Sequence, residues 1–426
     1  MKKTALGLAL AATLMAGAAP TGSALAQTTE ITVDYSIPDI FKEVHETIAK
    51  DFMAKHPNIK VTFRAPQPGY EEITQQNLRQ AITNQLPDVA YHGLNRQRIF
   101  VDRNIAVDMG QFIAKEKDWA GAGYDGSLLT LGQVKGKQYG MGFSLSTPIL
   151  YYNADLVKKA GGDPNNFPTT WDGVFDLAKK IRALGDKTYG FHYDWDITGN
   201  WMFQALVFSN GGTMLSPDET KVAFDGPAGQ KAVATLAKMV KEGTMRDVAA
   251  AAVLQDFVSG NLGIWAHSTS RLSGVTKQIG DKFALRTARF PLGDAKGLLP
   301  AGGNAAMIFA KDPKKQAAAW EYVKFATGPV GATYMVKGTG YFPANAKPAK
   351  DPAMLGEFYK QNPNHMTAVG QLPVLTGWYA FPGEHGLKIT DVIKDHLQSI
   401  VNQSADPQDA LKKMAKDVQA LLPKSS

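Results

Sequence analysis

The sequence ITVDYSIPDIFKEVHETIAKDFMAKHPNIKVTF, residues 31–63, holds a strand pattern, a helix pattern and a second strand pattern in direct succession. Apolar residues alternate in Ile31–Ser36, which is the period of a half-buried strand. They then recur at every fourth position across Val44–Phe52, as on one face of a helix. Pro57 ends that helix, and Ile59–Phe63 predicts the next strand.

The alternation continues beyond residue 63. A helix is predicted over Glu71–Thr83, and a short strand over Asp88–Tyr91. Strands and helices in this order are typical of an α/β domain with a largely parallel sheet. Later helix patterns cover Trp171–Leu184, Ala232–Lys241, Ala317–Phe325 and much of Ile389–Leu422, with an extended segment at Gly263–Ala266.

The first 26 residues have the order of a secretory signal peptide. Lys2 and Lys3 are followed by an apolar run, Ala5–Ala16, and a small-residue end, Ala24-Leu25-Ala26. Glycine and proline interrupt the run before it reaches the roughly 20 residues that a membrane span needs. We therefore expect residues 1–26 to be removed and the protein to be periplasmic.

Composition excludes several classes of protein. The chain has no cysteine, which rules out disulfides, thiolate catalysis, cysteine metal sites and a lipid anchor at the mature N-terminus. The formal charge of +7 is spread along the chain without a basic block, so nucleic-acid binding is not indicated. A chain of 426 residues with 44% apolar content predicts two domains.

Motifs of enzymes are missing. Gly121–Gly126 fits GxGxxG, but it follows the charged stretch Lys115–Asp118 and is predicted to be a surface loop. No phosphate-binding loop, nucleophile elbow or HExxH occurs, and the histidines are scattered. We expect no catalytic residue, no metal site and no cofactor. The alternative is a secreted carbohydrate hydrolase or lyase with two carboxylates far apart in the chain.

Aromatic and hydroxyl residues in non-periodic segments suggest a binding site instead. In His192–Trp201, Trp195 and Trp201 alternate with short polar residues, and an indole face can support the apolar face of a sugar. Trp195 is the favoured ligand contact, whereas Trp201 fits equally well as the core of a following helix.

Three further segments have two interpretations each. Ser144–Pro148 is either an ordinary turn or a set of groups for an anion or a sugar oxygen. His267–Arg271 either caps a helix through Ser270 or presents its hydroxyls to a ligand. Gly302–Asn304 either forms a bulge or lets a ligand approach the backbone closely.

Several of these segments also match a known family. Ser146–Leu156, Lys159–Pro164 and Pro168–Trp171 together resemble extracellular solute-binding proteins of ABC sugar importers, family 1. Phe257–Ile264 and Gly338–Ala344 are similar to two further segments of that family. The resemblance covers essentially the whole mature chain.

The resemblance implies a periplasmic-binding-protein type II-like fold of class α/β, with two α/β lobes, a hinge and a ligand cleft between them. Gly140–Gly142 and Gly302-Gly303 are the candidate chain crossings. The implied ligand is a sugar, a sugar acid or a polyol, phosphorylated or not, which a monomer delivers to ABC permease subunits. The expected first lobe comprises residues 27–140 and about 302–345, and the second about 141–301 and 346–426.

Within the family, three segments are most similar to the glycerol-3-phosphate-binding branch: Ser146–Asn153, Thr339–Pro343 and Phe358–Pro363. That branch has an acidic residue where this chain has Tyr91–Asn95, and an arginine where it has Gly386–Lys388. Lys388, Arg96, Arg98 or Arg271 is therefore the candidate partner of an anionic ligand. The ligand-binding residues that we predict are Tyr35, Tyr70, Asn95, Ser146, Thr147, Trp195, Trp201, Ser268, Gly303, Asn304 and Tyr341.

Overall fold

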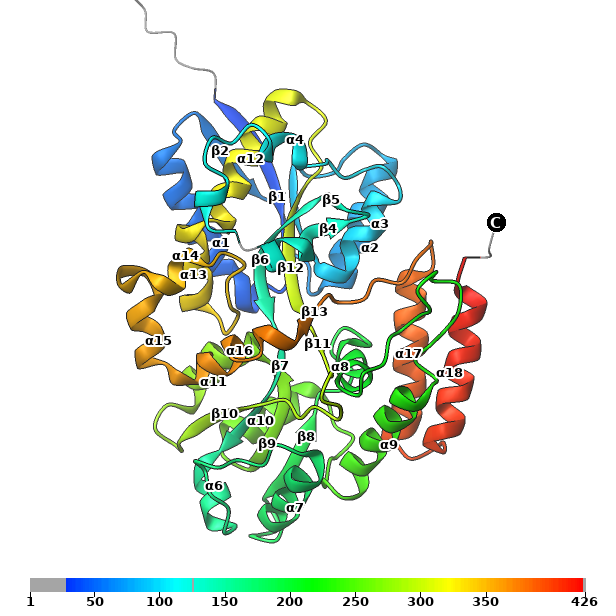
Figure 1. Ribbon diagram of the computed structural model, residues 1–426. Coiled ribbons are helices and arrows are strands. Elements are labelled where there is room, and N and C mark those ends of the chain that lie inside the picture. Colours follow the sequence, from blue (N-terminus) through cyan, green and yellow to red (C-terminus); the bar gives the residue numbers. More distant parts are fainter. Residues whose placement is uncertain (1–27, 125, 424–426) are drawn as a thin grey trace, which may run out of the picture.

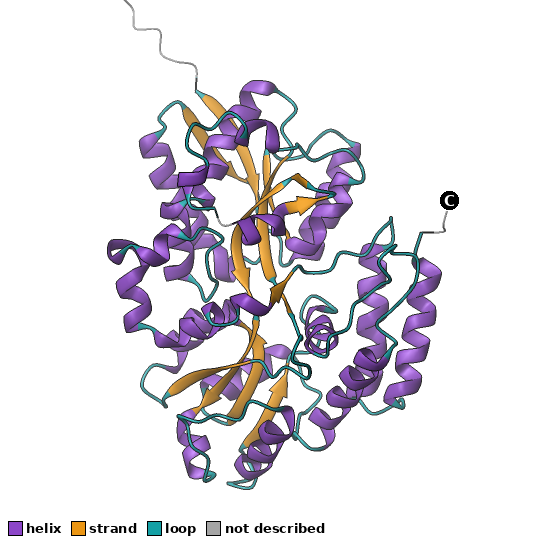
Figure 2. Cartoon of the chain, viewed as in Figure 1, coloured by secondary structure: helices purple, strands orange, loops and turns teal. Residues whose placement is uncertain are grey.

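Residues 28–124 and 126–423 are described by a computed structural model, so the predicted signal peptide lies outside the described residues. The chain forms two α/β lobes, one above the other in Figure 1, and each lobe is built around its own sheet (Figures 1 and 2). In the described part of the chain, no helix combines the length and the apolar content needed to cross a membrane.

The first lobe contains a five-stranded sheet in the order β2-β1-β3-β12-β6. The first three of these strands are parallel, and β12 is antiparallel to both of its neighbours. The strands are β1 (Thr29–Asp34), β2 (Ile59–Phe63), β3 (Val89–Gly93), β6 (Gly140–Ser146) and β12 (Gly302–Ile308). The helices around them are α1 (Pro38–Lys55), α2 (Tyr70–Ile82), α3 (Gln97–Val101), α4 (Gly110–Ile113), α5 (Gly126–Leu129), α12 (Pro313–Thr327) and α13 (Pro329–Gly338).

The apolar pattern of residues 31–63 is buried as its period predicts. Ile31 and Val33 of β1 are fully buried, and so are Phe41, Ile48 and Phe52 on one face of α1. Burying such side chains contributes about 1.5–3 kcal/mol each. This packing fixes β1 and α1 against each other at the centre of the first lobe.

The second lobe contains a four-stranded sheet in the order β10-β7-β9-β8. Only β8 and β9 are parallel, so the prediction of a largely parallel sheet is wrong for this lobe. The reason is that β7 enters directly from β6 of the other lobe, without a crossover helix. The strands are β7 (Pro148–Asn153), β8 (Tyr189–Tyr193), β9 (Leu262–Ser268) and β10 (Leu285–Arg289).

Helices of the second lobe cover this sheet and extend away from it as a bundle on the right of Figure 1. They are α6 (Ala154–Lys159), α7 (Trp171–Arg182), α8 (Trp201–Ser209), α9 (Pro227–Lys241), α10 (Ala250–Val258), α11 (Leu272–Ile279), α17 (Gly386–Val401) and α18 (Pro407–Leu421). Short elements complete the fold: α14 (Lys347–Lys350), α15 (Glu357–Gln361), α16 (Met366–Val369), and the strand pairs β4 (Gln133–Val134) with β5 (Lys137–Gln138) and β11 (Leu299–Pro300) with β13 (Leu375–Thr376).

The chain passes between the lobes more than once. Only Thr147 separates β6 of one sheet from β7 of the other, and Gly140–Gly142 lies inside β6. Leu355 and Tyr359 pack in the core cluster of the first lobe. We therefore propose lobe boundaries in which the first crossing is at Thr147 and the last follows Tyr359.

Candidate ligand-binding cleft

A cavity of about 300 Å³ lies between the two lobes. The ends of elements from both lobes meet there: Tyr70 begins α2, Ser146 ends β6, and Ser268 ends β9. Strand ends and helix starts expose hydroxyl and backbone groups that regular hydrogen bonding leaves free. We call this space the inner cavity; Ile37, Ile40, Asp194, Asp196, Ile197, Thr198, Trp201, Ala250, His267, Ser270, Arg271, Gly302, Gly303, Tyr341 and Trp378 complete its lining.

Six of the predicted ligand-binding residues line the inner cavity together, although they come from positions spread over most of the chain. Ligand contact by each of them stays a prediction. They are Tyr70, Ser146, Trp201, Ser268, Gly303 and Tyr341.

Four other predicted residues are buried behind the wall of the inner cavity or beside it. Tyr35 packs in the first-lobe core, with its ring centroid 4.6 Å from that of His45. Asn304 donates from Nδ2 to Tyr70 Oη at 3.2 Å, so it supports a lining residue. Asn95 is buried and Thr147 accepts a hydrogen bond from Gln371 Nε2 at 3.1 Å; neither lines the inner cavity.

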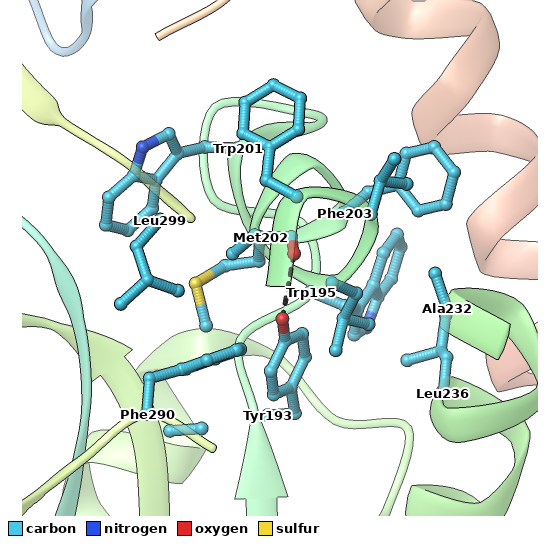
Figure 3. Close-up of a cluster of buried hydrophobic side chains, with 14 of the residues drawn as sticks. Tyr193, Trp195, Trp201, Met202, Phe203, Ala232, Leu236, Phe290 and Leu299 are labelled. Carbon is cyan, nitrogen blue, oxygen red and sulfur yellow. Dashed lines mark hydrogen bonds between the residues drawn. The ribbon is translucent and has the colours of Figure 1, made fainter. Parts of the chain in front are cut away.

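Trp195 lies in the hydrophobic core of the second lobe and not in the lining of the inner cavity. In Figure 3, Trp195 and Trp201 lie on opposite sides of the cluster, with Trp195 on the side of Ala232 and Leu236 of α9. Tyr193 Oη donates to the Met202 carbonyl at 2.8 Å between them. Trp201 is both a core residue and a cavity residue: it is the buried first residue of α8, and it also lines the inner cavity.

Four aromatic side chains form one wall of the inner cavity. The Trp378 ring lies 6.2 Å from Trp201 and 6.3 Å from Tyr70, centroid to centroid. Tyr70 shares a hydrogen bond with Tyr341. The pKa of Tyr70 is raised well above its usual value, mainly by burial and to a lesser extent by the neighbouring Tyr341. Both phenols are thus neutral hydrogen-bonding groups at physiological pH.

Two indole nitrogens in this wall lack a partner. Trp201 Nε1 and Trp378 Nε1 are buried and make no hydrogen bond to any described residue. A buried N–H without an acceptor costs about 1–3 kcal/mol, so it is normally satisfied. Both nitrogens have almost no accessible surface, so the packing of this wall encloses them and they do not face the cavity.

Asp194 is a buried carboxylate that also lines the inner cavity, and protein groups hold both of its oxygens. His192 Nε2 lies 3.2 Å from Oδ1, while His267 Nε2 lies 3.1 Å from Oδ2 and Trp265 Nε1 donates to Oδ2 at 2.8 Å. Burial alone would raise the pKa of Asp194, but these three neighbours outweigh it and the pKa is lowered. Burial, opposed by Asp194, lowers the pKa of His267 to about 4, so this imidazole is neutral at pH 7.

Arg271 is the candidate cation that lines the inner cavity. Its Nη1 lies 2.8 Å from Asp39 Oδ2, and this ion pair joins the second lobe to the first. Lys388 is exposed on α17, and Arg96 is paired with Glu71 at 2.7 Å; neither lines the cavity. Ser268, rather than Ser270, is the cap: its hydroxyl accepts from Ser270 N at 3.2 Å.

The backbone is strained at two points in the same lining. Ile37 has φ 57° and Thr198 has φ 48°, and both residues are β-branched. Left-handed backbone at such residues is rare and costs about 1–3 kcal/mol each, which the surrounding structure must supply. Strain of this kind gathers at ligand sites, which agrees with the position of both residues in the cavity wall.

Trp378, Asp194 and Asp196 line the inner cavity but are not among the ligand-binding residues predicted from the sequence. Trp378 follows the two-residue strand β13, and the segment Thr376–Tyr379 has no strand or helix periodicity. The same signal that selected Trp195 and Trp201, an aromatic among short polar residues, was present there.

The comparison with protein families agrees with this geometry. Residues 47–367 match the model of a family described as bacterial extracellular solute-binding protein. The chain belongs to this family. Its members bind small molecules and deliver them to ABC permeases, and they are not enzymes as a family.

Relatives and solved structures match this solute-binding protein over nearly its whole length. The sn-glycerol-3-phosphate-binding periplasmic protein UgpB of Escherichia coli K12 is 26% identical over 448 residues, which cover 96% of this chain and 94% of the relative. UgpB from Mycobacterium tuberculosis, in complex with glycerophosphocholine, has a TM-score of 0.82 at 22% identity and covers 92% of this chain and 98% of its own. Maltose-bound MalE3 of T. maritima has a TM-score of 0.79 at 20% identity, and the match covers 93% of this chain and 100% of MalE3.

These similarities confirm the two-lobed fold that the sequence predicts and the resemblance to ABC solute-binding proteins. The protein is therefore a substrate-binding component of an ABC importer. The cavity between its lobes is the candidate position of the solute.

Proposed function

We propose that this solute-binding protein acts in the periplasm as a monomer without enzymatic activity, and that its inner cavity holds an uncharged sugar or polyol unit. The observation that carries the proposal is the wall of four aromatic side chains beside the hydroxyls of Ser146 and Ser268 in the same lining. Aromatic faces contact the apolar face of a sugar, while neighbouring hydroxyl groups form hydrogen bonds with its oxygens.

The charge of the lining supports an uncharged unit. Asp194 and Asp196 both line the inner cavity, whereas the guanidinium of Arg271 is already paired with Asp39. A phosphate monoester carries up to two negative charges and would lie near two carboxylates. A sugar hydroxyl, by contrast, can donate to a carboxylate.

A phosphorylated polyol is the second candidate. Arg271 supplies a guanidinium at the cavity, and the E. coli relative is named for sn-glycerol 3-phosphate. This ligand would have to draw Arg271 away from Asp39, and Lys388 does not line the inner cavity.

The arrangement of Asp194 supports binding rather than hydrolysis. A glycosidase needs one carboxylate free to attack or to activate water and another to act as an acid. Both oxygens of Asp194 already accept contacts from His192, His267 and Trp265. A carboxylate held in this way is a poor nucleophile but a rigid ligand contact.

Closure of the lobes is the functional step that we propose. A ligand in contact with both lobes favours the closed state through its higher affinity for that state. The ion pair of Arg271 with Asp39 already joins the two lobes beside the cavity and would add to the stability of the closed state.

Thermal unfolding against a ligand panel tests the proposal. The protein, purified after export and stripped of bound solute, is mixed with neutral monosaccharides, polyols, sugar acids, sn-glycerol 3-phosphate and glycerophosphocholine. A ligand at about 1,000 times its Kd adds about 4 kcal/mol of stability. We expect shifts from neutral sugars or polyols; a shift from sn-glycerol 3-phosphate alone would establish the second candidate instead.

Turnover is measured on the same mixtures by chromatography. We expect no product from any glycan that binds. Product that disappears in Asp196→Asn, with binding retained, would establish the hydrolase or lyase alternative.

A further inference from the structure

A second and larger cavity lies between the lobes, with a volume of about 730 Å³. Trp378 lines both this space, which we call the outer chamber, and the inner cavity. The first lobe contributes Arg98 and the β4 segment around Gln133, and the second lobe contributes Thr213, Glu219 and Leu298. The two cavities are therefore neighbours on either side of one aromatic residue.

The charges of the outer chamber are already compensated. Arg98 Nη1 and Nη2 donate to Glu219 Oε1 and Oε2, both at 2.7 Å. Tyr379 Oη donates to the same carboxylate at 2.9 Å, and Lys135 is paired with Asp102 at 2.7 Å. An ionic group entering the chamber would have to break one of these pairs, which disfavours a charged occupant.

What remains of the lining is apolar and hydroxyl-bearing. Leu94, Val134, Leu215 and Leu298 provide apolar surface, and Thr213 and Thr376 provide hydroxyls. Patches of carbon beside isolated hydroxyls match a sugar ring, whose faces are apolar and whose edges are polar.

We propose that the outer chamber is a second subsite, which takes an uncharged glycosyl unit linked to the unit in the inner cavity. The ligand then passes along Trp378, and its natural form has at least two units. This inference rests on the proposed function of the inner cavity and adds the substrate class: an oligosaccharide or a glycosylated polyol rather than a single small sugar.

Matched saccharides test the inference by isothermal titration calorimetry. The probes are glucose with maltose and isomaltose, galactose with melibiose, and mannose with mannobiose. The expected result is that at least one disaccharide binds about tenfold or more tightly than its monosaccharide, a difference of about 1.4 kcal/mol.

Two variants fill the outer chamber from opposite sides. A β-carbon at Gly377 would meet no atom within 4 Å, so Gly377→Trp is accommodated without a clash at that carbon. Gln133→Trp does the same from β4 of the first lobe, where Gln133 is exposed. Gly274→Trp is the control, because Gly274 is exposed on α11, equally open, and lines neither cavity.

Both filling variants should abolish the advantage of the disaccharide and leave monosaccharide affinity within about twofold, whereas the control changes neither. Equal binding of monosaccharide and disaccharide by the unmodified protein overturns the inference but leaves the proposed function intact. Equal loss of both affinities in the two filling variants also overturns it, because the chamber then acts only through closure. Failure of every saccharide to bind overturns the proposed function together with the inference.

Discussion

Gly302 lies against the indole ring of Trp201, so closely that a β-carbon at position 302 would come within 2.8 Å of ring carbon Cζ2. The same β-carbon would lie 2.5 Å from Ser146 Oγ. The first residue of β12 thus sets the position of an aromatic residue from the other lobe and of a hydroxyl from β6. The next residue, Gly303, adopts φ 104°, and its missing side chain makes room for the Ser144 carbonyl.

Gly302→Ala should therefore weaken ligand binding without unfolding the protein. The added methyl group displaces the Trp201 ring or the Ser146 hydroxyl, and we expect an affinity loss of about tenfold, or about 1.4 kcal/mol. Calorimetric titration with the sugar identified by the panel measures it. Gly274→Ala on α11 is the control, since its methyl group would enter open space. Equal affinity of Gly302→Ala and the unmodified protein would show that the ligand does not depend on this wall.

The two tryptophans of residues 195–201 should respond differently to mutation. Trp195 is in the core, so Trp195→Ala should lower the free energy of unfolding by about 3–5 kcal/mol. Trp201→Phe keeps an aromatic ring but reduces the aromatic surface at the cavity wall, so it should weaken binding about fivefold or more with a smaller loss of stability. Urea unfolding and titration on each variant separate the two effects. The reverse outcome, with Trp195→Ala impairing binding alone, would move the ligand towards α9.

Local patterns predicted single elements of both lobes, such as α7 and much of α9 in the second, but not how the strands of the second lobe pair. Ile59–Phe63 is β2 with the predicted bounds, because alternation and the preceding Pro57 are local signals. The antiparallel pairing of β7 with β9 and β10 depends on a chain crossing, which no short window records. Pattern also could not reveal the left-handed backbone at Ile37, since tertiary packing alone imposes it.

The candidate site was partly predictable for the same reason. Ser146 and Tyr341 lie in family-like segments, Ser268 lies in a hydroxyl-rich segment after a strand, and all three line the inner cavity. Trp195 and Trp201 have similar neighbours in the sequence, yet only Trp201 lines the cavity. Its ring is placed there by its position as the first residue of α8, which a local pattern does not record. Trp378 comes from a segment without periodicity, more than 170 residues along the chain.

The ion pair between Arg98 and Glu219 should stabilise the closed state. Its two hydrogen bonds of 2.7 Å connect the segment after β3 with the segment after α8. Because both side chains are partly exposed, the pair is worth at most about 1 kcal/mol, so Glu219→Gln should weaken affinity by up to about fivefold, mainly through faster release. Stopped-flow measurement of ligand release tests this. Asp172→Asn is the control, since it removes a 2.8 Å ion pair with Lys238 inside the second lobe.

Acidic pH should act on the same pair. Hydrogen bonds from Arg98 are the main cause that lowers the pKa of Glu219 below its ordinary value of 4.5. The contribution to closure is therefore complete above pH 4.5 and is lost as pH falls through the lowered pKa. Ligand affinity should therefore stay constant with respect to this pair from pH 7 down to about pH 5, and the share due to the pair should fall only below pH 4.5. A loss at pH 6 that Glu219→Gln removes would contradict the assignment.

His45 should make the folded state sensitive to mild acid. It is fully buried in the first-lobe core, 4.4 Å from the Tyr91 ring and 5.0 Å from the Phe143 ring, and neither ring nitrogen has a partner among the described residues. Burial lowers the pKa of His45 from 6.5 to about 3. Below pH 6.5, His45 is therefore protonated in the unfolded chain but neutral in the folded protein. The free energy of unfolding falls as the pH decreases from 6.5 towards 3.

Replacing His45 by phenylalanine separates its effect on the pH dependence of stability from the similar effects of His92 and His267. Burial lowers the pKa values of these two histidines to about 3 and about 4. One such histidine costs about 2 kcal/mol between pH 7 and pH 5. His45→Phe should gain that amount relative to the unmodified protein over this interval, as measured by urea unfolding at both pH values. His385→Phe, at an exposed position, is the control. If the free energies of unfolding of His45→Phe and the unmodified protein differ by the same amount at pH 7 and at pH 5, His45 is protonated equally in the folded and unfolded states.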